Sequence, residues 1–420
     1  MKSNTMWRYN VATVILVVTI FMSALFTVWY SSVSTNSNVA LLQSAFVLLL
    51  LPEIIQRWKS SSLIKNKEFL FYTSLSLLSI CGWYAQGINV FEINRTYIYI
   101  IQLLFIISAV LWFRKIGDAG LEIIFRAKLQ VLLLSVLFIF IGLWKIGYPS
   151  MDWYHPVAGP IKFYVFRNIR HLNYEIAIVL MLATTCWVQK KTKFNSEYWF
   201  LFIFLGCFSL WTVGRGQIVA FYAFIGIFLL LSPSRLLKIE AFKPLLGFTL
   251  GVTLFILVTP DYLSYMQDRS SSGTINNISS GRLDIWFKGI DLTITSWLST
   301  IFGLGPEAYV RFREIPSFVH PHNAIVQLFM EFGLLGLTVL YMLVMKFIKN
   351  ALNIVKSPTV IAIFSALAAL SLYSLVDGII YHASPLMLTS LFIAYILSKQ
   401  EASLACLENQ NKQPIKPLEN

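Results

Sequence analysis

A histidine, His322, stands where a long polar stretch ends and an apolar run begins, in the segment His320-Pro321-His322-Asn323. Proline and asparagine are common where a helix starts, so His322 is predicted to lie at the mouth of the next helix. The positive end of the helix dipole disfavours the imidazolium there. A neutral imidazole can accept a proton, and we interpret His322 as a candidate general base. The alternative is an interfacial histidine bonded to a backbone carbonyl.

Zinc binding is a further hypothesis for the pair His320 and His322. A histidine pair alone lacks the cysteine or clustered carboxylate ligands of a zinc site, so the signal is weak. No CxxC spacing exists among the four cysteines, which are Cys81, Cys186, Cys207 and Cys406. We predict no metal site, no disulfide framework and no cofactor.

Arg215 lies between two apolar runs, with glycines on both sides in Gly214-Arg215-Gly216. A guanidinium close to hydrocarbon costs about 2.5–3.5 kcal/mol at a helix centre and less near an interface, so it needs a partner or a cavity. The two glycines would let a ligand approach the backbone. The alternative is an arginine that reaches the interface from a helix end and has no function.

Arg282 follows Ser279-Ser280-Gly281 and begins an amphipathic pattern. A cation in the first turn of a helix opposes the dipole unless an anion lies nearby, and the unpaired N–H groups would bind that anion too. An ion pair with Asp284 is the alternative. Together, Arg215 and Arg282 offer two planar guanidinium groups suited to phosphate oxygens, which predicts a diphosphate-binding site.

Other polar residues lie beside these candidates. Arg167, Arg170 and His171 come just before a predicted apolar helix at 172–189, and its first turn carries Asn173 and Glu175. We interpret this group as possible substrate contacts, with ion pairing among its members as the equal alternative. His320 and Asn323 are possible substrate contacts as well. For Glu331, inside the next apolar run, interhelical hydrogen bonding is predicted, and for Gly333 and Gly336 close packing.

The composition indicates a polytopic membrane protein. Of 420 residues, 57% are hydrophobic and 13% charged, and the mean hydropathy is +0.69, which is too apolar for an ordinary soluble domain. About twelve transmembrane helices are predicted in an all-α fold. They fall at 11–30, 38–55, 69–88, 96–113, 129–147, 172–189, 197–212, 217–232, 244–259, 323–345, 357–376 and 384–398.

These runs divide the chain into four parts. Residues 1–259 contain nine predicted spans, 260–322 form an extramembrane loop, 323–400 contain three spans, and 401–420 form a polar tail. Within the loop, apolar residues recur at three- and four-residue steps, at Leu283, Trp286, Ile290, Ile294, Trp297 and Ile301. This spacing predicts one amphipathic helix on the bilayer surface or across the end of the bundle.

The basic residues follow the predicted topology. The net charge is +13, but Lys and Arg occur in short clusters between apolar runs rather than on one domain, so nucleic-acid binding is not predicted. Segments with a basic excess alternate along the chain and contain 22 of the 33 Lys and Arg residues, Lys128 among them. Both termini are therefore predicted to be cytoplasmic. Arg215, Arg282 and all five histidines fall on the other side, where an anionic ligand would explain why the arginines are kept.

The motif Pro321-His322-Asn323, nine residues, Gly333, two residues, Gly336 resembles the signature of the bacterial O-antigen ligase and polymerase superfamily. Gly214-Arg215-Gly216 and the segment from Ser280 to Trp286 are similar to the two arginine sites of that family. The resemblance covers most of 150–350, and the rest of the chain only by topology.

The resemblance implies a GT-C-like membrane glycosyltransferase whose donor is a glycan linked to undecaprenyl diphosphate. Arg215 and Arg282 would hold the diphosphate, and His322 would activate the acceptor hydroxyl in a metal-independent, inverting reaction. The amphipathic helix and Trp286 would shape the lipid entrance. The site would face the periplasm, in the bacterial inner membrane.

An O-antigen ligase that uses lipid A–core as acceptor is the function we favour, and a polymerase of O-antigen or exopolysaccharide is the alternative. The moderate length of the 260–322 loop argues against a protein O-oligosaccharyltransferase. A transporter of an anionic lipid or solute is a further alternative from another class, because arginines within a bundle also mark transport pathways. The predicted partners are the lipid-linked glycan, the acceptor and membrane lipids.

Overall fold

The structure is a computed structural model, and the residues it describes are 2–25, 32–60, 78, 80–87, 90–146, 169–190, 196–212, 214–259, 282–306, 308, 321–354 and 357–411. The helices are α1 (Lys2–Leu25), α2 (Ser32–Ser60), α4 (Val90–Ile116), α5 (Ala119–Ile146), α6 (Ile169–Lys190), α7 (Ser196–Trp211), α8 (Arg215–Leu231), α9 (Arg235–Val258), α12 (Arg282–Thr293), α13 (Trp297–Phe302), α14 (Ala324–Ile354), α15 (Pro358–Asp377), the 3-10 helix η5 (Ile379–Tyr381) and α16 (Ala383–Asn411). No strand occurs in this part of the chain, which confirms the predicted all-α fold of a polytopic membrane protein.

Eight of the described helices are long and apolar enough to cross a membrane, namely α1, α2, α4, α5, α6, α9, α14 and α15. The shorter apolar helices α7 and α8 correspond to the predicted runs 197–212 and 217–232. The run predicted at 384–398 lies in α16, which continues to Asn411, beyond the predicted start of the tail. Most of the run at 69–88 lies outside the described residues. Where a predicted run is described, it coincides with a helix.

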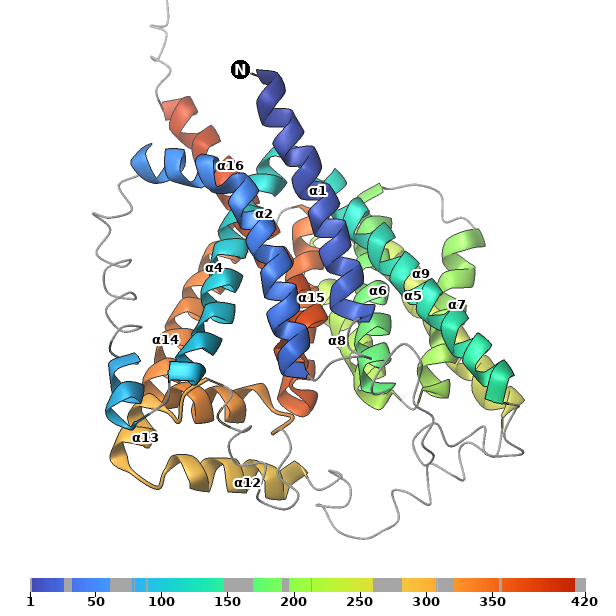
Figure 1. Cartoon of the computed structure of the whole chain (residues 1–420). Helices are drawn as coiled ribbons and strands as arrows, with labels where there is room; N and C mark the ends of the chain where they lie inside the picture. Colours follow the sequence, from blue (N-terminus) through green and yellow to red (C-terminus); the bar gives the residue numbers. More distant parts are fainter. Residues whose placement is uncertain are drawn as a thin grey trace, which may run out of the picture.

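Helix α6 forms the centre of the bundle (Figure 1). Every residue from Leu172 to Val188 is buried, and α5, α7, α8, α9, α15 and α16 all pack against α6. Because it is enclosed along its length, α6 holds the polar side chains of its first turns in a fixed place.

Helices α7 and α9 approach each other through two glycines. A Cβ at Gly251 would lie 2.0 Å from the carbonyl oxygen of Ile203, and one at Gly206 would lie 2.3 Å from that of Phe248. Backbones pack this closely only where no side chain intervenes. The contact fixes α7, whose end at Trp211 comes just before the start of α8 at Arg215.

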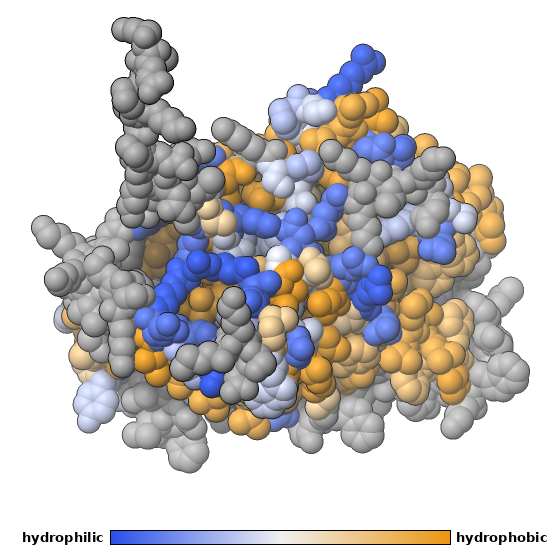
Figure 2. All heavy atoms as spheres, turned by 90° about the horizontal axis from the view of Figure 1, so that it is seen from above, coloured by the Kyte–Doolittle hydropathy of each residue, from blue (hydrophilic) through white to orange (hydrophobic). Residues whose placement is uncertain are grey.

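The described ends of the chain lie at the same end of the bundle, where α1 begins and α16 finishes (Figure 1). Seen from this side, hydrophilic residues gather across the middle of the surface and hydrophobic residues lie along much of its edge (Figure 2). Arg57 and Arg114 both bind Glu401 at this end. The two described chain ends therefore share one side of the bundle, as predicted, and the assignment of that side to the cytoplasm remains a prediction.

The predicted amphipathic helix is broken into two, which corrects the prediction of a single helix over 283–301. Helix α12 ends at Thr293 and α13 begins at Trp297. Ser296 forms a capping box with Ser299 and so starts a new helix. Ile285, Trp286 and Ile290 pack on α14, but Ile294 and Trp297 are exposed because the break turns them away from this contact.

Helix α14 bends sharply at Gly333, inside the predicted span over 323–345, which is therefore not one straight helix. Gly333 has φ 62° and ψ −164°, values that only glycine adopts readily. A Cβ at this position would lie 2.4 Å from the carbonyl oxygen of Ile301. At the bend, Leu304 and Gly305 donate backbone hydrogen bonds to the carbonyl oxygens of residues 330 and 331, at 2.6 and 3.0 Å. The close packing predicted for Gly333 is confirmed.

The bend gives the two halves of α14 different roles. Its first turns lie against α12, where Val326 and Met330 contact Ile285, Trp286 and Ile290. These two segments run across the end of the bundle opposite to the start of α1 (Figure 1), and the rest of α14 returns along the bundle. His322 and Asn323 are thereby placed at that end.

Candidate active site

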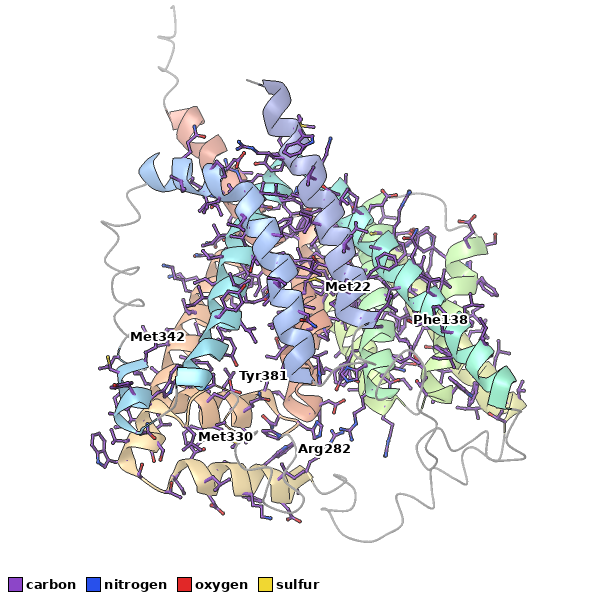
Figure 3. All side chains as sticks on the ribbon, viewed as in Figure 1. Met22, Phe138, Arg282, Met330, Met342 and Tyr381 are labelled. Carbon is purple, nitrogen blue, oxygen red and sulfur yellow. The ribbon has the colours of Figure 1, made fainter. Side chains whose placement is uncertain are left out.

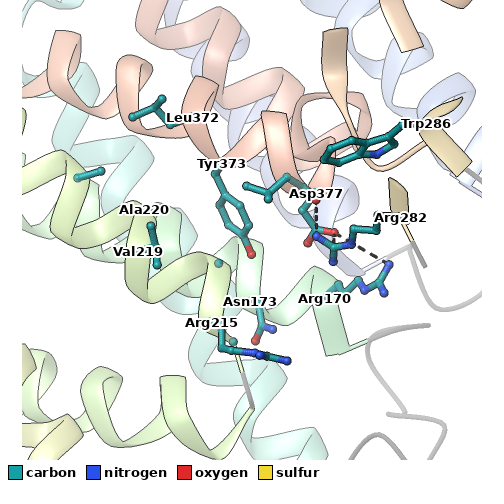
Figure 4. Close-up of a pocket in the computed structure, with 14 residues that line it drawn as sticks. Arg170, Asn173, Arg215, Val219, Ala220, Arg282, Trp286, Leu372, Tyr373 and Asp377 are labelled. Carbon is teal, nitrogen blue, oxygen red and sulfur yellow. Dashed lines mark hydrogen bonds and ion pairs between the residues drawn. The ribbon is translucent and has the colours of Figure 1, made fainter. Parts of the chain in front are cut away.

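A cavity of about 580 Å³ opens at the end of the bundle where α12 lies. Helices α6, α8, α12 and α15 line it, and Figure 3 shows Arg282 in this region, far from the start of α1. Figure 4 shows the charged side chains on one side of the cavity and the apolar side chains Val219, Ala220 and Leu372 on the other. The cavity thus has a polar wall and an apolar wall.

Three guanidinium groups, those of Arg170, Arg215 and Arg282, stand on the polar wall, and Asp377 is the acidic residue among the described residues that line it. Three cations less one anion give this wall a formal charge of +2. The two arginines predicted to bind a diphosphate therefore line the same cavity, although 66 residues lie between them in the sequence.

Arg215 is the first residue of α8, and its side chain is exposed. Gly214 is the N-cap and gives the helix no side-chain hydrogen bond, so no cap side chain competes with a ligand for the N–H groups of the first turn. Gly214, Arg215 and Gly216 all line the cavity. A free helix N-terminus beside a guanidinium is a favourable place for an anion.

Gly216 also serves packing. A Cβ there would lie 2.4 Å from the ring of Tyr373 on α15. The glycine therefore lets α8 approach α15, in addition to the predicted approach of a ligand.

Arg282 begins α12 and bridges this helix to the end of α15. Its Nη2 lies 3.3 Å from Oδ1 of Asp377, and its Nη1 donates a hydrogen bond to the carbonyl oxygen of Val376. Its Nε is buried and has no hydrogen-bond partner among the described residues. A buried donor without a partner is costly unless a ligand or water meets it. The predicted alternative, an ion pair with Asp284, is not the one that forms.

Asp377 is the centre of the site, and it was not among the residues predicted from the sequence. Its Oδ1 lies 4.0 Å from Nη1 of Arg170 and 3.7 Å from Nδ1 of His322, and its Oδ2 accepts a hydrogen bond of 3.1 Å from the hydroxyl of Tyr174. The side chain is only 8% exposed. Asp377 is the last residue of α15, where a negative charge opposes the helix dipole. This unfavourable position was the signal that cations would be found around it.

His322 lies beside the cavity, in contact with two residues of its polar wall. Nη1 of Arg170 is 3.1 Å from its Nε2 and 3.4 Å from its Nδ1. The backbone of His322 has φ 52°, and no other described residue apart from glycine has a positive φ. Such strained positions cluster at functional sites. The indole of Trp286 donates a hydrogen bond of 2.6 Å to the carbonyl oxygen of Pro321 and so fixes the preceding residue.

The contact with Arg170 restricts the protonation of His322. A guanidinium has hydrogen-bond donors and no acceptor. A ring nitrogen that accepts from it must therefore be unprotonated, and the neutral imidazole is the form that can act as a base. Asp377 lies on the Nδ1 side, where a carboxylate can orient a neutral imidazole, as in other histidine–carboxylate pairs.

The remaining predicted contacts have different surroundings. Asn323 caps α14, since its Oδ1 accepts hydrogen bonds of 2.9 and 3.1 Å from the N–H groups of Ile325 and Val326. His171 packs on His382, with ring centroids 4.7 Å apart, and is not part of the cavity wall. Asn173 lines the cavity, and its buried Oδ1 meets no hydrogen-bond donor in the part of the chain that the structure describes. Arg167 and His320 lie outside the described residues.

Glu175 does not pair with its neighbours in the sequence. It binds Lys128 of α5, with Nζ 2.9 Å from Oε2, and both side chains are buried. The sequence analysis placed Lys128 in a loop, which is wrong because α5 begins at Ala119 and carries Lys128 into the bundle. For Glu331 the prediction is confirmed, since Tyr99 of α4 donates a hydrogen bond of 2.7 Å to its carboxylate.

Comparison with known families identifies the central part of the chain. Residues 200–341, about a third of the sequence, match the family model described as O-antigen ligase. Over these residues the chain is similar to the O-antigen ligase and polymerase superfamily. The predicted resemblance is therefore confirmed. No curated protein and no solved structure matches the chain.

The O-antigen ligase match contains Arg215, Arg282 and His322, whereas Arg170 and Asp377 lie outside it. The cavity thus joins residues of the matched region to residues from helices before and after it. The superfamily consists of membrane glycosyltransferase-like enzymes, both ligases and polymerases. The match supports this class and does not distinguish a ligase from a polymerase.

Proposed function

We propose that this protein is an O-antigen ligase that transfers a glycan from undecaprenyl diphosphate to a hydroxyl group of lipid A–core. In this proposal Arg215 and Arg282 bind the diphosphate and His322 is the general base. Arg170 is a further contact to the diphosphate, and Asp377 holds Arg170 and Arg282 in place.

One observation carries the proposal: the cavity combines a surplus of positive charge with an apolar wall that reaches the outside of the bundle. Val219, Leu372 and Val376 line the cavity and are 66%, 49% and 48% exposed. Helices α8 and α15, which carry them, are apolar along their length. A ligand with a dianionic or trianionic head and a long hydrocarbon tail matches both walls, and a polyprenyl diphosphate has this form.

The chemistry follows from the placement of these groups. The acceptor oxygen attacks the anomeric carbon of the donor sugar, and the bond from that carbon to the diphosphate oxygen breaks. The proton of the acceptor hydroxyl passes to His322, and undecaprenyl diphosphate leaves with the electron pair. The attack comes from the face opposite to the leaving group, so the configuration inverts. The guanidinium groups and the N-terminus of α8 stabilise the charge of the leaving group, a role that needs no metal ion.

The contact between Arg170 and His322 implies that the donor binds before His322 can act on the acceptor. Nη1 of Arg170 lies 3.1 Å from Nε2 of His322, the nitrogen that would accept the proton. A diphosphate bound beside Arg282 offers Arg170 a stronger, charged partner than a neutral imidazole. Donor binding would therefore draw Arg170 away and free His322 for the acceptor.

We infer that the cavity faces the periplasm of a bacterial inner membrane and that both termini are cytoplasmic. The cavity and the described chain ends lie at opposite ends of the bundle (Figures 1 and 3). Clusters of basic residues at the chain-end side support a cytoplasmic location for that side. Undecaprenyl-linked glycans are used on the periplasmic face, where nucleotide sugars are absent.

A polymerase is the second candidate, because the family match does not separate it from a ligase. The surface glycan of a strain that lacks the gene distinguishes the two. For a ligase, the deletion abolishes all glycan-capped lipopolysaccharide while the lipid-linked polymer remains. For a polymerase, lipopolysaccharide with a single repeat unit remains. The wild-type copy should restore the original pattern.

The same strain tests the assigned roles. Complementation with His322→Ala or Arg215→Ala is expected to leave lipopolysaccharide uncapped, with the variant proteins at wild-type levels in the membrane. Full capping by both variants at normal protein levels would refute the roles given to these residues.

A further inference from the structure

A buried ionic cluster lies outside the cavity. Its member on α6, Glu175, directly follows Tyr174, which donates a hydrogen bond to Asp377. The cluster consists of Lys128 on α5, Glu175 on α6 and Ser384 in the first turn of α16. Nζ of Lys128 donates to both carboxylate oxygens of Glu175, at 2.9 and 3.2 Å, and also to the hydroxyl of Ser384, which in turn donates to Glu175. The side chains of Lys128 and Glu175 are 0% and 2% exposed.

Stability alone does not explain such a cluster. Burying two charges costs several kcal/mol per ion, and well-packed apolar residues of similar volume are often equally stable or more so. In a membrane-spanning bundle, ionisable residues are rare and usually functional. A fully satisfied polar network does, however, fix one arrangement of the elements that it joins.

One of the elements that this cluster joins, α6, also holds Asp377 through Tyr174. Asp377 and Ser384 are the two ends of a short connection between α15 and α16, which contains η5. Two successive residues of α6 hold both ends, because Tyr174 donates a hydrogen bond to Asp377 and Glu175 accepts one from Ser384. Between these anchors, His382 packs on Tyr174, with ring centroids 5.0 Å apart.

We propose that Glu175, together with Lys128 and Ser384, is a positioning residue for the transfer reaction. The cluster anchors the far end of the 377–384 connection on the rigid helix α6. This anchor keeps the carboxylate of Asp377 directed at Arg282, Arg170 and His322. The inference rests on the proposed function and adds residues that touch neither the donor nor the acceptor.

The test compares purified variants in detergent by three measurements: thermal stability, affinity for undecaprenyl diphosphate, and initial rates of glycan transfer to lipid A–core. The main variant is the double substitution Lys128→Met with Glu175→Leu, which removes both charges and keeps the volume. Ser384→Ala removes the hydroxyl that links the pair to α16, and Ser384→Thr retains a hydroxyl as its matched control.

The double variant should unfold within a few degrees of the wild type, since both buried charges are gone. Its kcat should fall by about fivefold to tenfold, because the reacting groups are slightly misplaced, while KM changes less. Ser384→Ala should be slower than Ser384→Thr, whose rate approaches that of the wild type.

Full transfer rates in both the double variant and Ser384→Ala would overturn the positioning role while the proposed function stands. If the double variant does not fold, the transfer rates of Ser384→Ala and Ser384→Thr are the test. Equal rates for these two variants would overturn the inference. A wild-type protein that neither binds undecaprenyl diphosphate nor transfers glycan would overturn the proposed function and this inference with it.

Discussion

At the end of the bundle where the chain begins, three arginines have two carboxylates as partners among the described residues, whereas at the cavity end three arginines have one. Arg57 and Arg114 both bind Glu401, and Arg8 lies 3.4 Å from Glu53. On the cavity wall, Arg170 and Arg282 share Asp377, and Arg215 forms no ion pair among the described residues. The first group has a formal surplus of one positive charge, and each of its arginines has a carboxylate partner. The second has a positive surplus that a bound anion would neutralise.

The comparison shows that the number of arginines at one end of a membrane protein is a poor guide to a binding site. What distinguishes the cavity end is the smaller number of carboxylates around its arginines, together with a helix N-terminus whose cap, Gly214, offers no side-chain hydrogen bond, and a buried Nε on Arg282 that has no partner among the described residues. Each of these features is a cost in the free protein that an anionic ligand would offset. The predictions below test this difference between the two ends.

The largest effect is expected at His322, the proposed general base. The end of the bundle where the chain begins has no residue with such a role in the proposed chemistry. His322→Asn should lower the rate of transfer by about a hundredfold to ten-thousandfold, because the amide cannot act as a base. Asparagine tolerates positive φ, so the backbone should be preserved and the thermal stability unchanged. Initial rates with purified donor and acceptor measure the effect. A variant that keeps half of the wild-type rate would exclude His322 as the base.

The second prediction compares arginines from both ends directly. Arg282→Lys and Arg215→Lys should each lower kcat/KM by about a hundredfold, because an ammonium group cannot replace a planar fork on a diphosphate. Arg57→Lys is the matched control and should stay within about twofold, as expected for a half-exposed surface pair. Equal losses in all three variants would show that the two ends do not differ in function.

The third prediction concerns the bend that brings His322 to the cavity end. Gly333→Ala should destabilise the protein by about 2–4 kcal/mol, from a backbone conformation that alanine resists and a Cβ with no space. Gly226 is the control, since a Cβ there meets nothing within 4 Å. Gly226→Ala should be neutral or stabilising by up to about 1 kcal/mol. Thermal unfolding in detergent tests the pair, and similar melting temperatures for both variants would contradict the role of the bend.

The smallest effect is expected at Asp377. Asp377→Asn raises the positive surplus on the cavity wall, so attraction of the donor by charge alone would become stronger. We expect instead a transfer rate about tenfold lower, because Arg170, Arg282 and His322 lose the carboxylate that holds them. Steady-state rates and affinity for undecaprenyl diphosphate separate these effects. A faster reaction in the variant would mean that the positive charge of the cavity wall determines the rate. The positions in which Asp377 holds Arg170, Arg282 and His322 would then not matter.

The sequence was sufficient to predict the apolar helices and the three residues at the centre of the proposal. Arg215, Arg282 and His322 stand at the ends of apolar runs, in places where a charge or a polar ring needs an explanation. Such anomalies are visible without a structure. The all-helical architecture also follows directly from run length, because each run must satisfy its own backbone in lipid.

The parts that could not be predicted depend on contacts between distant segments. Asp377 is a single acid after an apolar run, and only the fold shows that Arg282 lies 3.3 Å from it. Lys128 follows Arg126 closely, so it was assigned to a basic loop. Hydropathy does not show that Lys128 forms an ion pair with Glu175 of the next helix. The break after Thr293 depends on the capping box of Ser296, a local signal that the apolar periodicity concealed.

The most direct test of the account is glycan transfer by the purified protein in detergent, with a lipid-linked glycan as donor and lipid A–core as acceptor. We predict that each new glycan on lipid A–core is matched by one released undecaprenyl diphosphate, and that His322→Asn releases almost none. Absence of transfer by a folded wild-type protein, or equal release by His322→Asn, would contradict the account.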